Sequence, residues 1–304
     1  MRFATISTHS GPVAAVQLAD GRFLPVAAIA RAAGATDPAL LDGGLQALIE
    51  GGDATLALLA GIIGKADPAE AIAATDTVLL APLPSPAKNV FCVGRNYADH
   101  IAEGARALKA DIKATEVPVF FTKPSTTVIG PTAEIPIFPQ VSTSIDYEVE
   151  LALIIGKPGR NITKENAFEH VWGYTIVNDI TARDVQRRHG GQFFKGKALD
   201  GSCPMGPVIV TADEIADPHN LGLRTIVNGE VRQDGNTGQM IFDIPALIAS
   251  LSEGLTLSSG DILATGTPSG VGYAMEPPCF LAEGDEVICQ VDGIGELKNT
   301  LRNI

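Results

Sequence analysis

Prolines at alternate positions divide this chain into two unlike parts. They stand in the run Ala81-Pro82-Leu83-Pro84-Ser85-Pro86. Each proline fixes its own φ and disfavours helix at the residue before it, so such a run makes a stiff, extended connector. The sequence therefore predicts a small N-terminal domain with its linker over residues 1–86 and a larger domain over residues 87–304.

The first part has the pattern of a small α+β domain. Short strands are expected at residues 3–6, 13–18 and 22–26. Short helices are expected in alanine- and leucine-rich stretches at residues 26–33, 38–50 and 53–64. This part carries no constellation of reactive side chains, so we expect the chemistry in the second part.

The second part consists mainly of predicted strands and tight turns. Asn228-Gly229 is a strong hairpin signal. One short helix is expected at residues 96–104, ended by Gly104, and another is expected to begin at Thr181 with Asp184 in a capping-box pattern. Folded-back strands with few helices predict a β-rich α+β fold, not an alternating parallel α/β fold.

Composition narrows the class of protein. Hydrophobic residues make up 45% of the chain, enough for a substantial core, and the net charge of −13 disfavours a protein that tracks a nucleic-acid backbone. Four widely spaced cysteines favour a reduced compartment. The most apolar stretch, residues 54–64, is shorter than the ~20 residues that span a bilayer, and no signal peptide is recognised. We expect a cytoplasmic protein with neither nucleic acid nor a membrane as its partner.

The predicted strand at residues 147–155 carries two acidic residues at alternate positions. Side chains alternate between the faces of a strand, so Glu148 and Glu150 share one face while Tyr147 and Val149 share the other. Two neighbouring carboxylates suit a hard divalent ion such as Mg²⁺, Mn²⁺ or Ca²⁺. The alternative is a strand face exposed to solvent, which is the commoner meaning of such a pair taken alone.

A third carboxylate follows the next apolar strand. Asp179 directly follows the run at residues 174–178 and could supply a third oxygen ligand. Three carboxylates that leave positions open for water and substrate are typical of a catalytic metal site. The alternative is that Asp179 only caps the following helix or turn.

Basic residues gather just beyond Asp179. Arg183 and Gln186 are three residues apart and so share a helix face, and Lys197 lies next to a glycine. This local positive excess in an acidic chain indicates an anionic ligand, for which arginine is well shaped. An exposed basic helix face would also explain part of the excess, in particular Arg187 or Arg188.

Two further features could serve a reaction. His100 and Glu103 are spaced to meet on one helix face, where the carboxylate would orient the imidazole as a general base; a surface contact is the alternative. The loop at residues 266–272, GTPSGVG, lacks the features of a phosphate or dinucleotide loop, yet its amides and the Thr267 hydroxyl could hold a carboxylate.

Six motifs occur together and in order along the second part. They are VGRNYADH at 93–100, FTKPS at 121–125, YEVEL at 147–151, NDITARDVQ at 178–186, Lys197 before SCP at 202–204, and TGTPSGVG at 265–272. In this combination the chain resembles the fumarylacetoacetate hydrolase family over residues 87–304. The N-terminal part resembles the small, variable extra domain of some members.

The resemblance implies a catalytic domain of rolled mixed β-sheets that assembles as a homodimer. It implies Mg²⁺ or Mn²⁺ held by Glu148, Glu150 and Asp179. It places His100 and Glu103 on a mobile lid that continues through residues 105–116. It also places four residues around a small anionic 2-oxo acid substrate: Arg183, Gln186, Lys197 and Thr267.

The implied reaction is hydrolysis of a carbon–carbon bond in a 2,4-dioxo acid, an acylpyruvate, to give pyruvate and a carboxylic acid. His100, oriented by Glu103, would activate water, and Lys197 would stabilise the enolate that forms as the bond breaks. Two alternatives on the same scaffold are a 2-oxo acid decarboxylase acting on oxaloacetate and an enol–keto isomerase. A non-catalytic protein that binds a metal–oxoacid complex is an alternative of another class.

Overall fold

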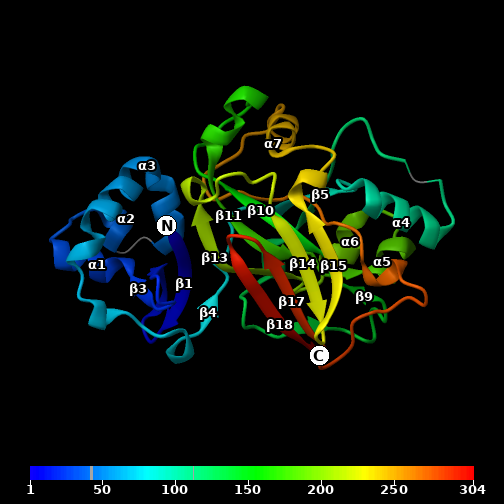
Figure 1. Cartoon of the computed structure of the whole chain (residues 1–304), viewed down its shortest axis with the longest axis horizontal. Helices are drawn as coiled ribbons and strands as arrows, with labels where there is room; N and C mark the ends of the chain where they lie inside the picture. The colour runs from blue at the N-terminus through cyan, green and yellow to red at the C-terminus, as the bar shows by residue number, and fades with distance from the viewer. Residues whose placement is uncertain (42–43, 112) are drawn as a thin grey trace.

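The computed structural model describes residues 1–41, 44–111 and 113–304, and two large β-sheets form its centre (Figure 1). The N-terminal segment contains β1 (Arg2–Thr8), β2 (Gly11–Gln17), β3 (Phe23–Pro25), α1 (Val26–Ala33), α2 (Pro38–Leu41), α3 (Gly44–Ile62) and β4 (Leu79–Leu80). Residues 42 and 43 of the helix expected at 38–50, and residue 112 of the expected lid, lie outside the described residues.

The remaining elements build the larger part. Its first half contains β5 (Val90–Gly94), α4 (Ala98–Leu108), β6 (Val119–Lys123), β7 (Val128–Ile129), β8 (Ile135–Ile137), β9 (Ile145–Asp146), β10 (Val149–Ile155), β11 (Val171–Asn178) and β12 (Thr181–Ala182). Its second half contains α5 (Arg183–Arg188), α6 (Phe193–Lys197), β13 (Cys203–Thr211), β14 (Gly222–Val227), β15 (Glu230–Asn236), α7 (Ile244–Ser252), β16 (Ile262–Ala264), β17 (Glu286–Val291) and β18 (Gly295–Asn303). This β-rich mixed architecture confirms the predicted fold class.

The larger sheet has the strand order β3-β2-β1-β13-β11-β10-β16-β5-β6, and the five-stranded sheet has the order β15-β14-β17-β18-β8. The central strand β10 is buried on both faces. Its residues Leu151 and Leu153 belong to the core shared with the five-stranded sheet, and Ala152 and Ile154 belong to a second core beneath the N-terminal helices. The predicted alternation of faces therefore holds along β10, but neither face meets solvent.

The N-terminal strands continue the larger sheet. Strand β1 pairs antiparallel with β13, with Phe3 opposite Ile209, while α1, α2 and α3 cover the outer side of this edge (Figure 1). Phe3 also stacks near Trp172 of β11, at 5.3 Å between ring centroids. The two parts therefore share one sheet, and the boundary at residue 86 stays a prediction.

Two predicted helix ends were wrong. Gly104 does not end α4, because the helix continues to Leu108 and Gly104 is buried where a Cβ would lie 2.5 Å from the hydroxyl of Tyr273. The next helix begins at Arg183, not at Thr181, because Thr181 is held in β12 against β9 and its hydroxyl donates to the carbonyl of Asp179. Tertiary pairing overrides the capping pattern here.

The predicted hairpin is confirmed. Asn228 and Gly229 have φ values of 51° and 83° between β14 and β15, the left-handed pair that a tight hairpin turn requires.

One helical stretch among the described residues, Gly44–Lys65, is long and apolar enough to cross a bilayer by length and composition alone. Gly52 breaks it, with φ 58° and ψ −152°. Leu48, Ile49 and Leu59 on this stretch are fully buried in the second core. Packing accounts for the buried 28% of the apolar window, and because core helices pass the same test, length and composition alone are weak evidence for a membrane span.

Candidate active site

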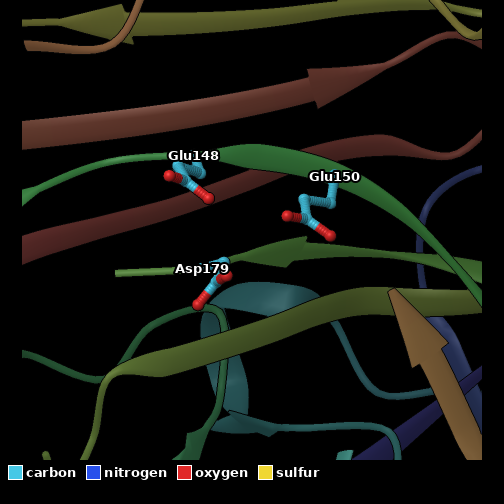
Figure 2. A group of neighbouring side chains, drawn as sticks. All are labelled: Glu148, Glu150 and Asp179. Carbon is cyan, nitrogen blue, oxygen red and sulfur yellow. The ribbon is translucent and has the colours of Figure 1, made fainter. Parts of the chain in front are cut away.

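Three carboxylates converge where β10 and β11 meet (Figure 2). Glu148 directly precedes β10, Glu150 is the second residue of β10, and Asp179 follows the last residue of β11. The strand expected from residue 147 thus begins at Val149. The backbone N–H of Asp179 donates to the carbonyl of Glu148 at 2.8 Å, and one carboxylate oxygen of each residue lies within 4.8 Å of the others. The three residues are at most 4% exposed, which is inconsistent with a solvated strand face. We call them the acidic triad.

Two buried cations bind the carboxylate of Glu148. Lys197 Nζ donates to Glu148 Oε2 at 2.7 Å and also to Asp179 Oδ2 at 2.6 Å. Arg183 Nη2 donates to Glu148 Oε1 at 2.6 Å, and its Nε donates to Asp146 Oδ2 at 2.8 Å. Both oxygens of Glu148 therefore face a positive charge.

The members of the triad differ in their ease of ionisation. Burial disfavours the charged form of Glu148, but the charges of Lys197 and Arg183 outweigh burial and lower its pKa to about 2. Burial raises the pKa of Glu150 well above its usual range, and the negative charges of Asp179 and Glu148 add to this effect. Glu150 accepts one hydrogen bond, from the backbone N–H of Gly266 at 2.9 Å. A cation beside Glu150 would relieve this repulsion.

The donor set fits a divalent cation. Among the described residues at this site, four buried carboxylates (Asp146, Glu148, Glu150 and Asp179) face three buried cations (Lys123, Arg183 and Lys197). Asp179 Oδ1 is buried without a hydrogen bond among those residues, although Lys123 Nζ lies 2.8 Å away. When all four carboxylates are ionised the site carries an excess negative charge, which a hard metal ion bound by the triad would compensate.

The glycine-rich loop holds carboxylates of the protein itself. The backbone N–H of Gly266 donates to Glu150, that of Gly270 to Glu103 Oε2 at 2.8 Å, and that of Gly272 to Asp146 at 2.7 Å. Gly270 has φ 106°, and a Cβ there would collide with the carbonyl of Arg232, so only glycine allows this course. The loop is thereby hydrogen-bonded to the triad through Glu150, to the helix α4 through Glu103, and to Asp146, which also binds Arg183.

His100 and Glu103 form the predicted pair on α4. His100 Nδ1 lies 2.8 Å from Glu103 Oε1, and the second oxygen of Glu103 is held by Gly270. Because Nδ1 is engaged, Nε2 is the ring nitrogen left for a reacting group. His100 lines the same cavity as the triad.

Seven of the nine predicted site residues line one cavity of about 150 Å³. They are His100, Glu148, Glu150, Arg183, Gln186, Lys197 and Thr267. Of the other two, Glu103 is bonded to His100 and Asp179 is bonded to Lys197. Arg187, Arg188 and Lys195 are all exposed, and of these three Arg187 lines the cavity.

Several residues around the cavity carried no role in the sequence-based prediction. Lys123 contacts Asp179, and its charge in an apolar strand was a usable signal. Gln233, from the five-stranded sheet, donates to Thr267 Oγ1 at 2.8 Å and accepts from the N–H of Val149 at 3.0 Å. Tyr273 lies under the guanidinium of Arg183, 4.4 Å from the ring centroid. The contacts of Gln233 and Tyr273 join segments remote in sequence, so no local sequence pattern indicates them.

Known proteins share both the sequence and the fold. The family described as fumarylacetoacetate (FAA) hydrolase C-terminal matches residues 89–302. Oxaloacetate tautomerase YisK of Bacillus subtilis (strain 168) is 52% identical over 227 residues, which cover 75% of this chain and 74% of that protein. Fumarylacetoacetate hydrolase from psychrophilic Exiguobacterium antarcticum is 40% identical, with a TM-score of 0.81 over all of both chains.

A further solved structure bears on the metal. Maleylpyruvate hydrolase from Sphingobium sp. SYK-6, in complex with manganese (II) ion and pyruvate, is 30% identical with a TM-score of 0.78, and the match covers 100% of this chain and 99% of that one. The acidic triad of this chain and the manganese of that neighbour both point to a divalent metal. By sequence, by fold and by the six ordered motifs, the chain belongs to the fumarylacetoacetate hydrolase family.

Proposed function

We propose that this chain is a metal-dependent tautomerase that interconverts the enol and keto forms of a small 2-oxo acid of the oxaloacetate type. The proposal rests on the His100–Glu103 pair, a candidate general base that lies at the same small cavity as the triad and Lys197. The 52% identity to an oxaloacetate tautomerase supports this reaction over the hydrolysis that the sequence alone favours. The cavity is also smaller than the ~300–1,000 Å³ typical of drug-sized ligands.

Proton transfer is assigned to His100. Its Nε2 takes a proton from the carbon next to the oxo group, and Glu103 stabilises the imidazolium that results. Lys197 lies in the same cavity and stabilises negative charge on the oxo oxygen. The His100 imidazolium then gives its proton to that oxygen, which forms the enol and restores the neutral imidazole. The reverse sequence returns the keto form.

The other residues of the site are assigned to bind the metal ion or to orient its ligands and the substrate. Glu148, Glu150 and Asp179 would hold Mg²⁺ or Mn²⁺, and that ion would supply Lewis acidity at the oxo group. Arg183 already donates to Asp146 and Glu148, so we assign it to orient Glu148 within the triad. Gln186 and Thr267 are assigned to orient the substrate.

Hydrolysis of a 2,4-dioxo acid is the second candidate. The same His100–Glu103 pair could activate water, and a structural neighbour is a maleylpyruvate hydrolase. Decarboxylation of oxaloacetate is the third, since it too passes through an enolate.

One set of assays separates the candidates. Metal-stripped protein is mixed with oxaloacetate or acetylpyruvate, with and without Mn²⁺, while enol absorbance and released pyruvate are followed separately. Metal-dependent enol–keto relaxation of oxaloacetate without pyruvate supports the tautomerase. Pyruvate from oxaloacetate indicates a decarboxylase, and pyruvate from acetylpyruvate indicates a hydrolase. Tight Mn²⁺ and oxalate binding with no turnover would instead favour a binding protein.

We also propose a homodimer, as the family resemblance suggests, and a cytoplasmic location, as the widely spaced cysteines suggest. Light scattering at several protein concentrations tests the dimer.

A further inference from the structure

The described lining of the cavity contains more cationic side chains than carboxylates. Its lining includes four cationic side chains, Arg95, Arg183, Arg187 and Lys197, in a chain whose net charge is −13. Arg183 and Lys197 are paired with acidic residues at the triad. Within residues 1–41, 44–111 and 113–304, Arg95 and Arg187 have no ion-pair partner.

Arg95 is positioned by its backbone and by an aromatic ring. It follows the end of β5 with φ 60°, a left-handed conformation that is uncommon for a residue other than glycine and that clusters at functional sites. Its guanidinium lies 5.7 Å from the centroid of Phe193, which also lines the cavity. A half-buried arginine held in this way is more than a solvated surface charge.

Arg187 lines the same cavity. It lies four residues after Arg183 on α5, so the two share a helix face. Its guanidinium lies 5.8 Å from the centroid of Tyr273, the ring that Arg183 also covers. The side chain of Arg187 is exposed, as is that of its neighbour Arg188, but of the two Arg187 lines the cavity.

We propose that Arg95 and Arg187 bind a second carboxylate of the substrate, which makes the site selective for small dicarboxylic 2-oxo acids over monocarboxylic ones. The guanidinium group matches a carboxylate in shape and charge, and neither group is committed elsewhere among the described residues. The inference rests on the proposed function for the reaction, but the recognition it describes can be measured without turnover.

The test uses two unreactive acids of equal chain length, (S)-malate and (S)-2-hydroxybutyrate, which differ in the second carboxylate. Their affinities for the Mn²⁺-loaded protein are measured by calorimetry. We expect wild type to prefer malate, and R95Q and R187Q each to lower malate affinity about tenfold to a hundredfold, as loss of a charged hydrogen bond does. Affinity for 2-hydroxybutyrate and for Mn²⁺ should stay unchanged, and R188Q is the matched control.

Equal affinity of wild type for the two acids would overturn the proposal. So would a double variant R95Q/R187Q that still prefers malate, or variants that weaken both acids equally. A malate preference that needs both arginines, in a protein without tautomerase activity, would uphold the second-carboxylate site and reject the proposed reaction. Tautomerase activity without a malate preference would do the reverse.

Discussion

The acidic triad and the His100–Glu103 pair face one cavity but are held in different ways. The triad lies at the start of β10 and directly after β11, two paired strands in the middle of the larger sheet, and three buried cations surround it. The pair stands on α4, a helix at the rim whose outer side is exposed. A hydrogen bond from the N–H of Gly270 to Glu103 links the pair to the glycine-rich loop.

We infer from this difference that the triad serves metal binding and that the pair on α4 serves the reaction. Strands buried on both faces hold metal ligands in one geometry, as a metal site requires. We expect the rim helix α4, with its exposed outer side, to open at a lower free-energy cost than the strands, so that it admits substrate and then presents a base. Changes to the triad should therefore abolish metal binding, whereas changes on α4 should alter turnover with metal binding intact.

The largest effect is expected at Glu150. Because burial and like charge raise the pKa of Glu150, the neutral Glu150→Gln side chain should fit the metal-free fold without loss of thermal stability. Losing a metal ligand should lower turnover by about a thousandfold or more, since Lewis acidity is worth several kcal/mol. Mn²⁺ titration by electron paramagnetic resonance, together with the melting temperature, checks both points. Normal Mn²⁺ affinity in this variant would refute the metal assignment.

His100→Gln should lower turnover by about a hundredfold to ten-thousandfold, the usual contribution of a general base. Mn²⁺ affinity should match that of wild type, because His100 contacts Glu103 and, within the described part of the chain, makes no hydrogen bond to the triad. Stopped-flow relaxation of oxaloacetate enol measures the first quantity and calorimetry the second. Should Mn²⁺ binding fall with turnover, the two regions would not be separable as described.

The same difference decides what the sequence could predict. Alternation along one strand placed Glu148 and Glu150 together, and a carboxylate after the next strand suggested Asp179, because strand geometry is local and regular. The i,i+3 spacing likewise predicted the contact of His100 with Glu103. Contacts made across the fold could not be read in this way. Gly104, expected to end α4, is small because Tyr273 packs on it.

The cations around the triad also make contacts that the sequence pattern could not predict. A cluster of basic residues predicted an anionic ligand, but spacing could not tell Arg183, which binds Asp146 and Glu148, from the exposed Arg188. Burial of β10 on both faces was equally hidden, since it depends on which sheets and helices cover the strand. Thr181 was expected to cap a helix, and its pairing with β9 is a tertiary contact.

Glu103→Gln should have a smaller effect than loss of the histidine. The amide can still accept a hydrogen bond from His100, but its NH₂ group would then face the N–H of Gly270, and two donors repel. We expect turnover to fall about tenfold to a hundredfold, as for other residues that orient a reacting group, with Mn²⁺ affinity unchanged. Asp99→Asn, an exposed change on the same helix, is the control. Equal losses in both variants would indicate general damage to α4.

The smallest effect tests how α4 is joined to the triad. In Gly104→Ala the new Cβ would lie 2.5 Å from the Tyr273 hydroxyl, so the ring must move, and that ring carries the guanidinium of Arg183 at 4.4 Å. Alanine itself favours the helix by about 1 kcal/mol, so stability should not fall. We expect KM to rise about threefold to tenfold, because disturbance of coupled side chains typically amounts to about 0.5–3 kcal/mol.

A double-mutant cycle decides whether the Tyr273 hydroxyl carries this effect. Tyr273→Phe removes the atom that the new Cβ would meet, so Gly104→Ala should raise KM in the wild-type background but not in the Tyr273→Phe background. A KM increase of the same size in both backgrounds would show that α4 acts on the site by another route. Loss of the effect in the second background would show that the rim helix and the strand-borne ligands communicate through the contact of Tyr273 with Arg183.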